Sequence, residues 1–263
     1  MREVAGPEGA PVLLLLHGWL ASGGLNWFRA FDLLGEHFRV LAVDLRGHGR
    51  GIRTRRRFRL ADCADDAAAT LEALGVARAI AVGYSLGGPV AQLLWRRHPE
   101  KVSGLVLCST AHRLMPGLRE QWVFATMMAA AAGTTRLGQL ATAVPVRRVR
   151  SLLPVQAAPG RPSTLRQWAR AEMQRHNPRM VLEAGVAMSN YDASRWIGRV
   201  DVPAAVVVTA KDRAVAPLAQ LQLALSIPAA TIHRIDDGHL VCAKRTFAPP
   251  LLRACRDVAS RAE

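Results

Sequence analysis

Short runs of apolar residues, each bounded by turn-forming residues, recur along the chain. They cover residues 12–16, 40–43, 79–82, 105–108, 204–209 and 231–235. Continuous runs rich in Val, Ile and Leu are typical of parallel strands that are buried on both faces. Segments with helical spacing separate many of these runs, at 27–37, 61–74 and 89–98. The alternation predicts an α/β fold with a doubly wound, mainly parallel sheet.

The pattern changes in the middle of the chain. Between about residues 112 and 199 the strand-like runs stop, and helical spacing dominates at 121–132, 164–176 and 179–191. We therefore predict a helical cap inserted between two strands, over the carboxyl edge of the sheet, where open α/β sheets keep their sites. The expected organisation is a core in two parts, 1–111 and 200–263, with the cap at 112–199.

Composition fits one large α/β domain, because the chain has 263 residues of which half are hydrophobic. The formal net charge is +15, and almost all of the excess is arginine. Such a charge favours polyanions, anionic membrane surfaces or acidic substrates as partners. It is equally consistent with a general compositional bias towards arginine and alanine.

The densest run of arginines spans Arg46–Arg59. Contact with nucleic acid or an anionic membrane through this run is one interpretation. A solvated loop is the preferred one, because Phe58 is the single aromatic residue there that could stack on bases. At the strand end beside the run, Asp44 and Arg46 are expected to brace neighbouring loops of the site by hydrogen bonds.

The four cysteines are widely spaced, and none forms a Cys-x-x-Cys pair. They predict neither a zinc site nor a redox motif, and no metal or cofactor is expected. Reduced thiols fit a cytoplasmic protein. The apolar run at 12–16 is too short for a secretory signal and follows a segment that is not net basic, so we interpret it as a buried strand. No segment is long and apolar enough to span a membrane.

The most informative motif is Gly83-Tyr84-Ser85-Leu86-Gly87, which follows one strand-like run and precedes a helical one. Small residues on both sides of a serine let the backbone turn sharply from strand to helix, which exposes the hydroxyl at the edge of the sheet. The pattern alone also occurs by chance in loops. With the strand and helix around it, the motif makes Ser85 a candidate nucleophile, with Gly83 and Gly87 in support.

A serine nucleophile needs a base to take its proton and an acid to orient that base. His239 follows the last strand-like run, and Asp212 follows the run before it. The order Ser, Asp, His is the one found in this architecture. Plainer roles are a surface histidine and a turn or helix-capping aspartate. Asp236 and Asp237 are alternative acids, but they are too near His239 in sequence to reach its Nδ1 easily.

Oxyanion donors are expected from two backbone N–H groups, those of Leu86 and Trp19. Trp19 follows His17 and Gly18 at the end of the first strand-like run. Glycine at position 18 permits the close approach of the backbone that such a donor requires.

Taken together, these residues resemble the α/β-hydrolase superfamily over most of the chain. The motifs that carry the resemblance are Leu16-His17-Gly18-Trp19, Asp44-Leu45-Arg46-Gly47-His48-Gly49, Gly83–Gly88, Thr209-Ala210-Lys211-Asp212 and Gly238-His239. The resemblance implies a serine hydrolase with Ser85, Asp212 and His239 as its triad and a helical cap over the pocket. It is closest to the esterase and lipase-like branch.

The same resemblance argues against dehalogenase and epoxide hydrolase activity, and the chain departs from the family pattern at its amino-terminal end. Dehalogenases and epoxide hydrolases of this fold normally carry Asp at the position of Ser85. Members usually begin with an antiparallel hairpin, but here only residues 1–11 precede the strand that ends in His17-Gly18. At most one strand of that hairpin fits.

The sequence therefore predicts hydrolysis of a small-molecule carboxylic ester through an acyl-enzyme on Ser85. The apolar segment 122–128 in the cap suggests a hydrophobic acyl group. Alternatives on the same triad are an acyltransferase, a cofactor-free perhydrolase or haloperoxidase, and a hydrolase of carbon–carbon bonds. From another class, the alternative is a non-catalytic protein that binds anionic surfaces through Arg46–Arg59.

Overall fold

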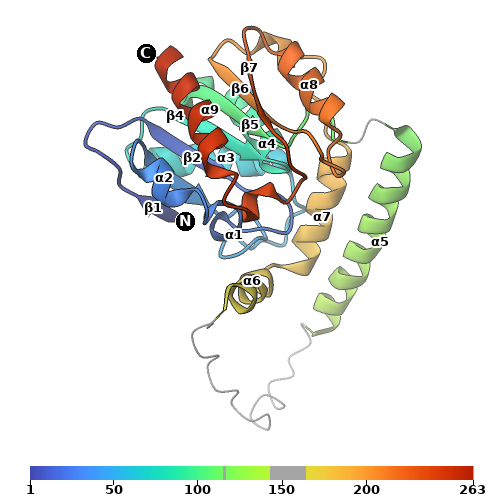
Figure 1. The fold of residues 1–263 in the computed structure, drawn as a ribbon. Helices are drawn as coiled ribbons and strands as arrows, with labels where there is room; N and C mark the ends of the chain where they lie inside the picture. The colour runs from blue at the N-terminus through green and yellow to red at the C-terminus, as the bar shows by residue number, and fades with distance from the viewer. Residues whose placement is uncertain (115–116, 143–163, 263) are drawn as a thin grey trace.

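A seven-stranded sheet lies at the centre of the computed structural model, which describes residues 1–114, 117–142 and 164–262 (Figure 1). Its order is β1-β3-β2-β4-β5-β6-β7. The strands are β1 (Arg2–Val4), β2 (Val12–Leu16), β3 (Arg39–Val43), β4 (Ala79–Tyr84), β5 (Val102–Cys108), β6 (Ala204–Thr209) and β7 (Thr231–Ile235). Every pair except β1 with β3 is parallel. The prediction of a mainly parallel sheet is confirmed, and each predicted run lies within a strand.

The amino-terminal edge of the sheet is a single short strand. β1 runs antiparallel to β3, with Glu3 opposite Leu41, and Glu3 also accepts hydrogen bonds from the Arg39 guanidinium. The segment before β2 thus supplies one antiparallel strand, as its length allowed.

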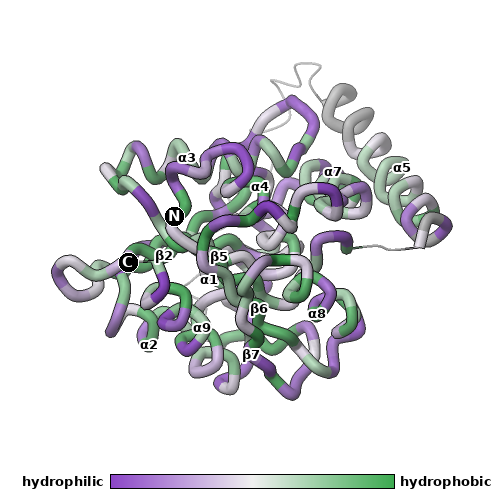
Figure 2. Tube along the Cα trace, turned by 90° about the horizontal axis from the view of Figure 1, so that it is seen from above, coloured by the Kyte–Doolittle hydropathy of each residue, from purple (hydrophilic) through white to green (hydrophobic). Residues whose placement is uncertain are grey.

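Helices cover both faces of the sheet (Figures 1 and 2). One face carries α1 (Gly23–Trp27), α2 (Phe31–Gly35) and α9 (Ala248–Arg261), and the other carries α3 (Leu60–Ala73), α4 (Gly87–Arg97) and α8 (Pro217–Ser226). Short 3-10 turns are formed in the described ranges by Pro99–Lys101, Ile197–Arg199 and Val241–Ala243.

The expected single helix at 27–37 is instead two short helices, α1 and α2. The Ser22 hydroxyl accepts a hydrogen bond from the Leu25 N–H, so α1 begins earlier than the apolar pattern indicates. A turn follows, in which the Ala30 N–H donates to the Trp27 carbonyl at 2.8 Å.

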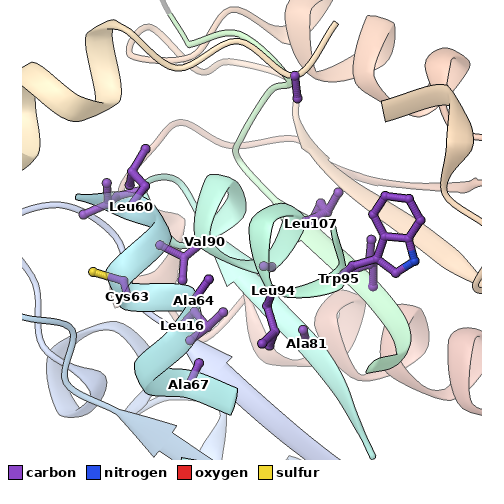
Figure 3. Close-up of a cluster of buried hydrophobic side chains, with 14 of the residues drawn as sticks. Leu16, Leu60, Cys63, Ala64, Ala67, Ala81, Val90, Leu94, Trp95 and Leu107 are labelled. Atoms are coloured by element: carbon purple, nitrogen blue, oxygen red, sulfur yellow. The ribbon is translucent and has the colours of Figure 1, made fainter. Parts of the chain in front are cut away.

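Two hydrophobic cores lie on the two faces of the sheet. Because side chains alternate along a strand, Leu14 and Leu16 of β2 enter one core and Leu13 and Leu15 enter the other. In the first core, small residues of α3 such as Ala64 let that helix lie close to α4 above the strands (Figure 3).

Between β5 and β6, the described residues form the helices α5 (Leu118–Thr142), α6 (Leu165–Met173) and α7 (Pro178–Ser189). α5 runs beside α7 on the side away from the sheet (Figure 1). Pro178 in the first turn and the Asn177 side chain, which accepts from the Met180 N–H, fix the start of α7. We call α5, α6 and α7 the helical insertion. The division at residues 112 and 199 stays a prediction.

None of the helices in the described ranges has the length and apolarity needed to cross a lipid bilayer.

Candidate active site

Ser85 lies in a tight turn between β4 and α4, with a φ of 49° that side chains rarely adopt. Two glycines make the turn possible. A Cβ on Gly83 would overlap the Gly87 carbonyl, and a Cβ on Gly87 would overlap the carbonyl of Leu16 on β2. The Ser85 carbonyl accepts from the Thr110 hydroxyl at 2.9 Å, which holds the turn against the neighbouring loop.

His239 contacts Ser85 and Asp212 through its two ring nitrogens. The distance from Nε2 to Ser85 Oγ is 3.0 Å, and the distance from Nδ1 to Asp212 Oδ2 is 2.7 Å. Because a carboxylate only accepts, Nδ1 carries the proton, and Nε2 is free to accept from the serine hydroxyl. The turns after β4, β6 and β7 thus bring together the three residues that the sequence selected.

Asp212 is held by five donors, one of which is Gln220 Nε2, 3.3 Å from Oδ2. Its Oδ1 accepts from the Ala214 and Val215 N–H groups, at 2.8 and 2.9 Å. Its Oδ2 accepts from the Thr209 hydroxyl at 2.7 Å and from His239. Burial acts to raise the pKa of Asp212, but the hydrogen bonds from His239, Val215 and Thr209 outweigh it and hold the pKa below its usual value. The carboxylate is therefore ionised at neutral pH.

The backbone around Trp19 passes close to Ser85. A Cβ on Gly18 would lie 3.4 Å from Ser85 Cβ, and the Gly18 N–H donates to Asn26 Oδ1 at 3.0 Å. Within the described part of the chain, no hydrogen bond takes the N–H of Trp19 or that of Leu86. Both amides are therefore free to bind another acceptor.

His17 and Asp44 hold the adjoining loops in place. The fully buried His17 ring accepts from the Leu45 N–H at 2.9 Å and donates from Nδ1 to the Gly18 carbonyl at 2.8 Å. Burial lowers the pKa of His17 to about 4, so the ring is neutral at pH 7. Asp44 accepts from the N–H groups of Gly23, at 2.7 Å, and Arg50, at 2.9 Å.

Arg46 has different partners from those expected. Its guanidinium binds Asp66 of α3, with Nη2 2.8 Å from Oδ1, and also contacts Asp62 at 3.4 Å. Arg46 therefore links its loop to α3 and does not reach the loops around Ser85.

The arginine-rich segment is packed against the helical insertion. Arg179 of α7 donates to the carbonyls of Thr54 and Arg56, and the Phe58 N–H donates to Glu183 at 2.8 Å. Contact of this segment with nucleic acid or membranes, the less favoured interpretation of the sequence, stays untested.

A cavity of about 610 Å³ opens between the Ser85 turn and the helical insertion. Ser85 and His239 line it together with mostly apolar residues: Gly18, Trp19, Leu20, Ala21, Leu25, Asn26, Tyr84, Leu114, Phe124, Met173, Met188, Ala214, Val215, Leu240, Cys242 and Ala243. Among the described residues that form its wall there is no Asp, Glu, Lys or Arg. The described ranges also contain no cluster of His, Cys, Asp and Glu side chains suited to a metal ion.

Sequence reasoning missed three supporting side chains. The Tyr84 hydroxyl donates to the His239 carbonyl, Gln220 Nε2 contacts Asp212 at 3.3 Å, and Asn26 holds Gly18. Tyr84 belongs to the motif Gly83–Gly87, so the sequence singled out its position but not the role of its hydroxyl. Nothing in the local sequence marks the other two.

The sequence profile of a family described as alpha/beta hydrolase fold matches residues 11–246. A pimeloyl-[acyl-carrier protein] methyl ester esterase from Chromobacterium violaceum is 34% identical over 230 residues, 87% of this chain and 86% of that protein. A magnesium-chelatase 30 kDa subunit from Rhodobacter capsulatus is 30% identical over 247 residues, 90% of this chain and 83% of that protein.

Among solved structures, a hydrolase from Pseudomonas aeruginosa PA01 superimposes with a TM-score of 0.73 at 26% identity. The match covers 97% of this chain and 92% of that one. The profile match and the relatives span nearly the whole chain, and the fold agrees with them. The chain therefore belongs to the alpha/beta hydrolase fold family, and it is an enzyme of that family.

Proposed function

We propose that this enzyme hydrolyses carboxylic esters with an uncharged, apolar acyl group, through an acyl-enzyme on Ser85. The observation that carries the proposal is the position of His239, 3.0 Å from Ser85 Oγ and 2.7 Å from Asp212 Oδ2. A nucleophile, a base and an orienting carboxylate in this order are what acyl transfer to serine requires. The similarity to an esterase over most of the chain supports the same reaction.

In the acylation half, Ser85 Oγ attacks the acyl carbon while its proton passes to His239 Nε2. The N–H groups of Trp19 and Leu86 bind the oxyanion that develops on the carbonyl oxygen. Asp212, ionised and anchored by backbone donors, stabilises the imidazolium and keeps its Nε2 directed at the serine. Nε2–H then protonates the leaving alcohol as the bond between acyl carbon and alkoxy oxygen breaks.

In the deacylation half, water enters where the alcohol left. His239 Nε2 takes a proton from the water as its oxygen attacks the acyl carbon. The second tetrahedral intermediate uses the same two N–H donors. Its collapse releases the carboxylic acid, and His239 returns the proton to Ser85 Oγ.

The cavity supports the choice of acyl group. An apolar wall stabilises a buried hydrocarbon chain, whereas a charged acyl group would lose its hydration without gaining a partner there. In this proposal the helical insertion acts as the cap, since Phe124, Met173 and Met188 supply its share of the wall.

Fluorophosphonate labelling tests the nucleophile. We expect wild type to be labelled on Ser85 and Ser85→Ala to be unlabelled, whereas Ser189→Ala, a buried serine of α7 outside the cavity wall, should keep its labelling. Labelling that persists in a folded Ser85→Ala variant would refute the assignment.

A chain-length series of nitrophenyl esters tests the reaction and the acyl group. Activity should rise from acetate to medium-chain esters as apolar surface is buried, and Ser85→Ala should lower kcat by about 10³-fold or more. Free acid as the product distinguishes hydrolysis from transfer to another acceptor. Activity that does not depend on acyl length would contradict the apolar acyl site.

A further inference from the structure

The side chain of Trp19 connects the loop beside Ser85 to the helical insertion. Its indole Nε1–H donates to the Val181 carbonyl of α7 at 2.8 Å. Its ring meets Phe124 of α5 edge-on, with centroids 5.9 Å apart and planes inclined by 74°. One side chain thus contacts two helices of the insertion, while the backbone of the same residue lies in the loop that passes Ser85.

A glycine in the interior of α7 makes room for this ring. A Cβ on Gly185 would lie 3.1 Å from Trp19 Cζ2 and 3.3 Å from Met128 Cγ, which is tighter than ordinary contact. Glycine in a helix interior is unfavourable relative to alanine, so its presence there has a reason elsewhere. Because Gly185 lies one turn after Val181, the indole finds its acceptor and its space on the same face of α7.

A second attachment fixes the neighbouring residue of the loop. His176, between α6 and α7, donates from Nε2 to the Leu20 carbonyl at 3.2 Å, while its Nδ1 accepts from the Gly49 N–H at 2.8 Å. Leu20 itself has a φ of 61°, a conformation that needs support from its surroundings. The loop at residues 19 and 20 is therefore attached to the insertion at two successive positions.

We propose that Trp19 is a positioning residue through its side chain. The contacts of its indole with α5 and α7 hold the Trp19 backbone N–H in the position that binds the oxyanion. The inference rests on the function proposed above, in which that N–H is one of the two oxyanion donors. The oxyanion site is complete only when the helical insertion is seated on the loop. Substrate contacts that seat the insertion thereby also complete the site for the acyl-transfer step.

Two substitutions disturb this contact in different ways. Trp19→Phe keeps an aromatic ring but removes the indole N–H, and Gly185→Ala pushes the ring away while favouring the helix. Gly133→Ala is the matched control, because Gly133 is also interior to a helix of the insertion but a Cβ there would meet nothing within 4 Å.

Each variant is assayed with nitrophenyl acetate, whose small acyl group makes little use of the cavity wall. Affinity for a trifluoromethyl ketone, which forms a hemiketal oxyanion on the serine, is measured beside kcat, KM and Tm. We expect Trp19→Phe and Gly185→Ala to lower kcat roughly 5- to 20-fold and to lower the affinity for the ketone by a similar factor. Displacing an oxyanion donor reduces the rate less than removing it does. KM should stay within about twofold, and each variant should stay folded at the assay temperature, as its Tm shows.

The double variant should lose about as much kcat and ketone affinity as the more impaired of the two single variants, because both changes act through one contact. Unchanged kcat and ketone affinity in Trp19→Phe and Gly185→Ala would overturn the inference, as would an effect confined to KM or one shared by Gly133→Ala. In each of those cases an inactive Ser85→Ala leaves the proposed function standing. An active Ser85→Ala overturns both.

Discussion

Tyr84 joins the two chain segments that supply the proposed nucleophile and base. Its ring is buried, edge-on to Trp27 and Phe247 with centroids 6.1 and 5.6 Å away, and its hydroxyl donates to the His239 carbonyl. Because Tyr84 directly precedes Ser85, one hydrogen bond ties the loop of the base to the strand of the nucleophile. The motif Gly83–Gly87 thus positions the proposed base as well as the serine.

Tyr84→Phe removes that hydrogen bond and keeps the ring. We expect a loss of about 1 kcal/mol in unfolding free energy and a several-fold fall in kcat, with KM unchanged. The other tyrosine of the chain gives the control, since Tyr191 donates to Gln92 Oε1 at 2.9 Å, away from the cavity wall. Tyr191→Phe should lose similar stability and keep its kcat, and equal kcat values for the two variants would contradict the role of Tyr84.

The buried His17 gives stability a predictable dependence on pH. Its pKa is lowered by burial from 6.5 to about 4, so below pH 6.5 the unfolded chain binds a proton that the folded chain does not. The contribution of the neutral His17 to the unfolding free energy is therefore fully present above pH 6.5 and is lost as pH falls towards 4. His17 alone should lower the unfolding free energy by roughly 2 kcal/mol between pH 7.5 and 5.

Urea unfolding at the two pH values measures this loss. The neighbouring His48, whose pKa burial lowers to about 3, adds to it in the same direction. In His17→Asn the loss should shrink, because the His17 ring no longer takes up a proton on unfolding. A loss as large in the variant as in wild type would contradict the assignment.

At the scale of elements, α6 is held to the core by a buried carboxylate. Glu172, 3% exposed, accepts from the Ser22 hydroxyl at 3.2 Å and from Arg50 Nη1 at 3.3 Å. Arg175 and Arg2 add cationic groups at 3.4 and 3.9 Å. Arg2 belongs to β1 and Arg50 to the loop after β3, while Arg175 lies in the turn that follows α6. The Glu172 side chain therefore fixes the helix to two separate parts of the core.

Glu172→Gln keeps the side-chain volume and removes the charge. Charge-assisted hydrogen bonds contribute about 1.5–3 kcal/mol, so α6 should be held less firmly and the Tm should fall. Since the next residue, Met173, lines the cavity, KM for medium-chain esters should rise several-fold while kcat for acetate is kept. The exposed Glu100→Gln serves as the control, and an unchanged KM with a lowered Tm would show that α6 does not shape the acyl site.

Sequence alone predicted the elements that depend on local pattern. The buried strands β2 to β6 were found because each contains a continuous apolar run, whereas β7 is only half-buried and contains His233 and Arg234. The candidates Ser85, Asp212 and His239 were found because each follows one of the predicted strands. What escaped prediction depends on contacts between distant segments. The capping hydroxyl of Ser22 moved the start of α1, and Arg46 found its partners on α3.

At the scale of the whole molecule, a strongly basic chain encloses a cavity with a mostly apolar wall. The chain carries a formal net charge of +15, while the described part of the cavity wall contains no Asp, Glu, Lys or Arg. Long-range attraction therefore acts on anionic molecules in solution, whereas in the proposed function the apolar cavity favours uncharged acyl groups.

A neutral ester should accordingly be insensitive to salt. Added salt screens surface charges over about 10 Å at 0.1 M and leaves apolar contacts largely unchanged. We expect kcat/KM for nitrophenyl butyrate to vary less than about twofold between 50 and 500 mM NaCl. A steep decline with salt would mean that arginines take part in binding the ester.

The four leucines of β2 are shared in pairs between the cores on the two faces of the sheet. If either layer of helices separated from the sheet, it would expose one pair of these leucines. The other layer packs against the same strand and would lose its support. The sheet and its two layers should thus melt in one cooperative step. α5, which lies against α7 on the side away from the sheet, stands outside that shared burial and can open locally while the rest stays folded.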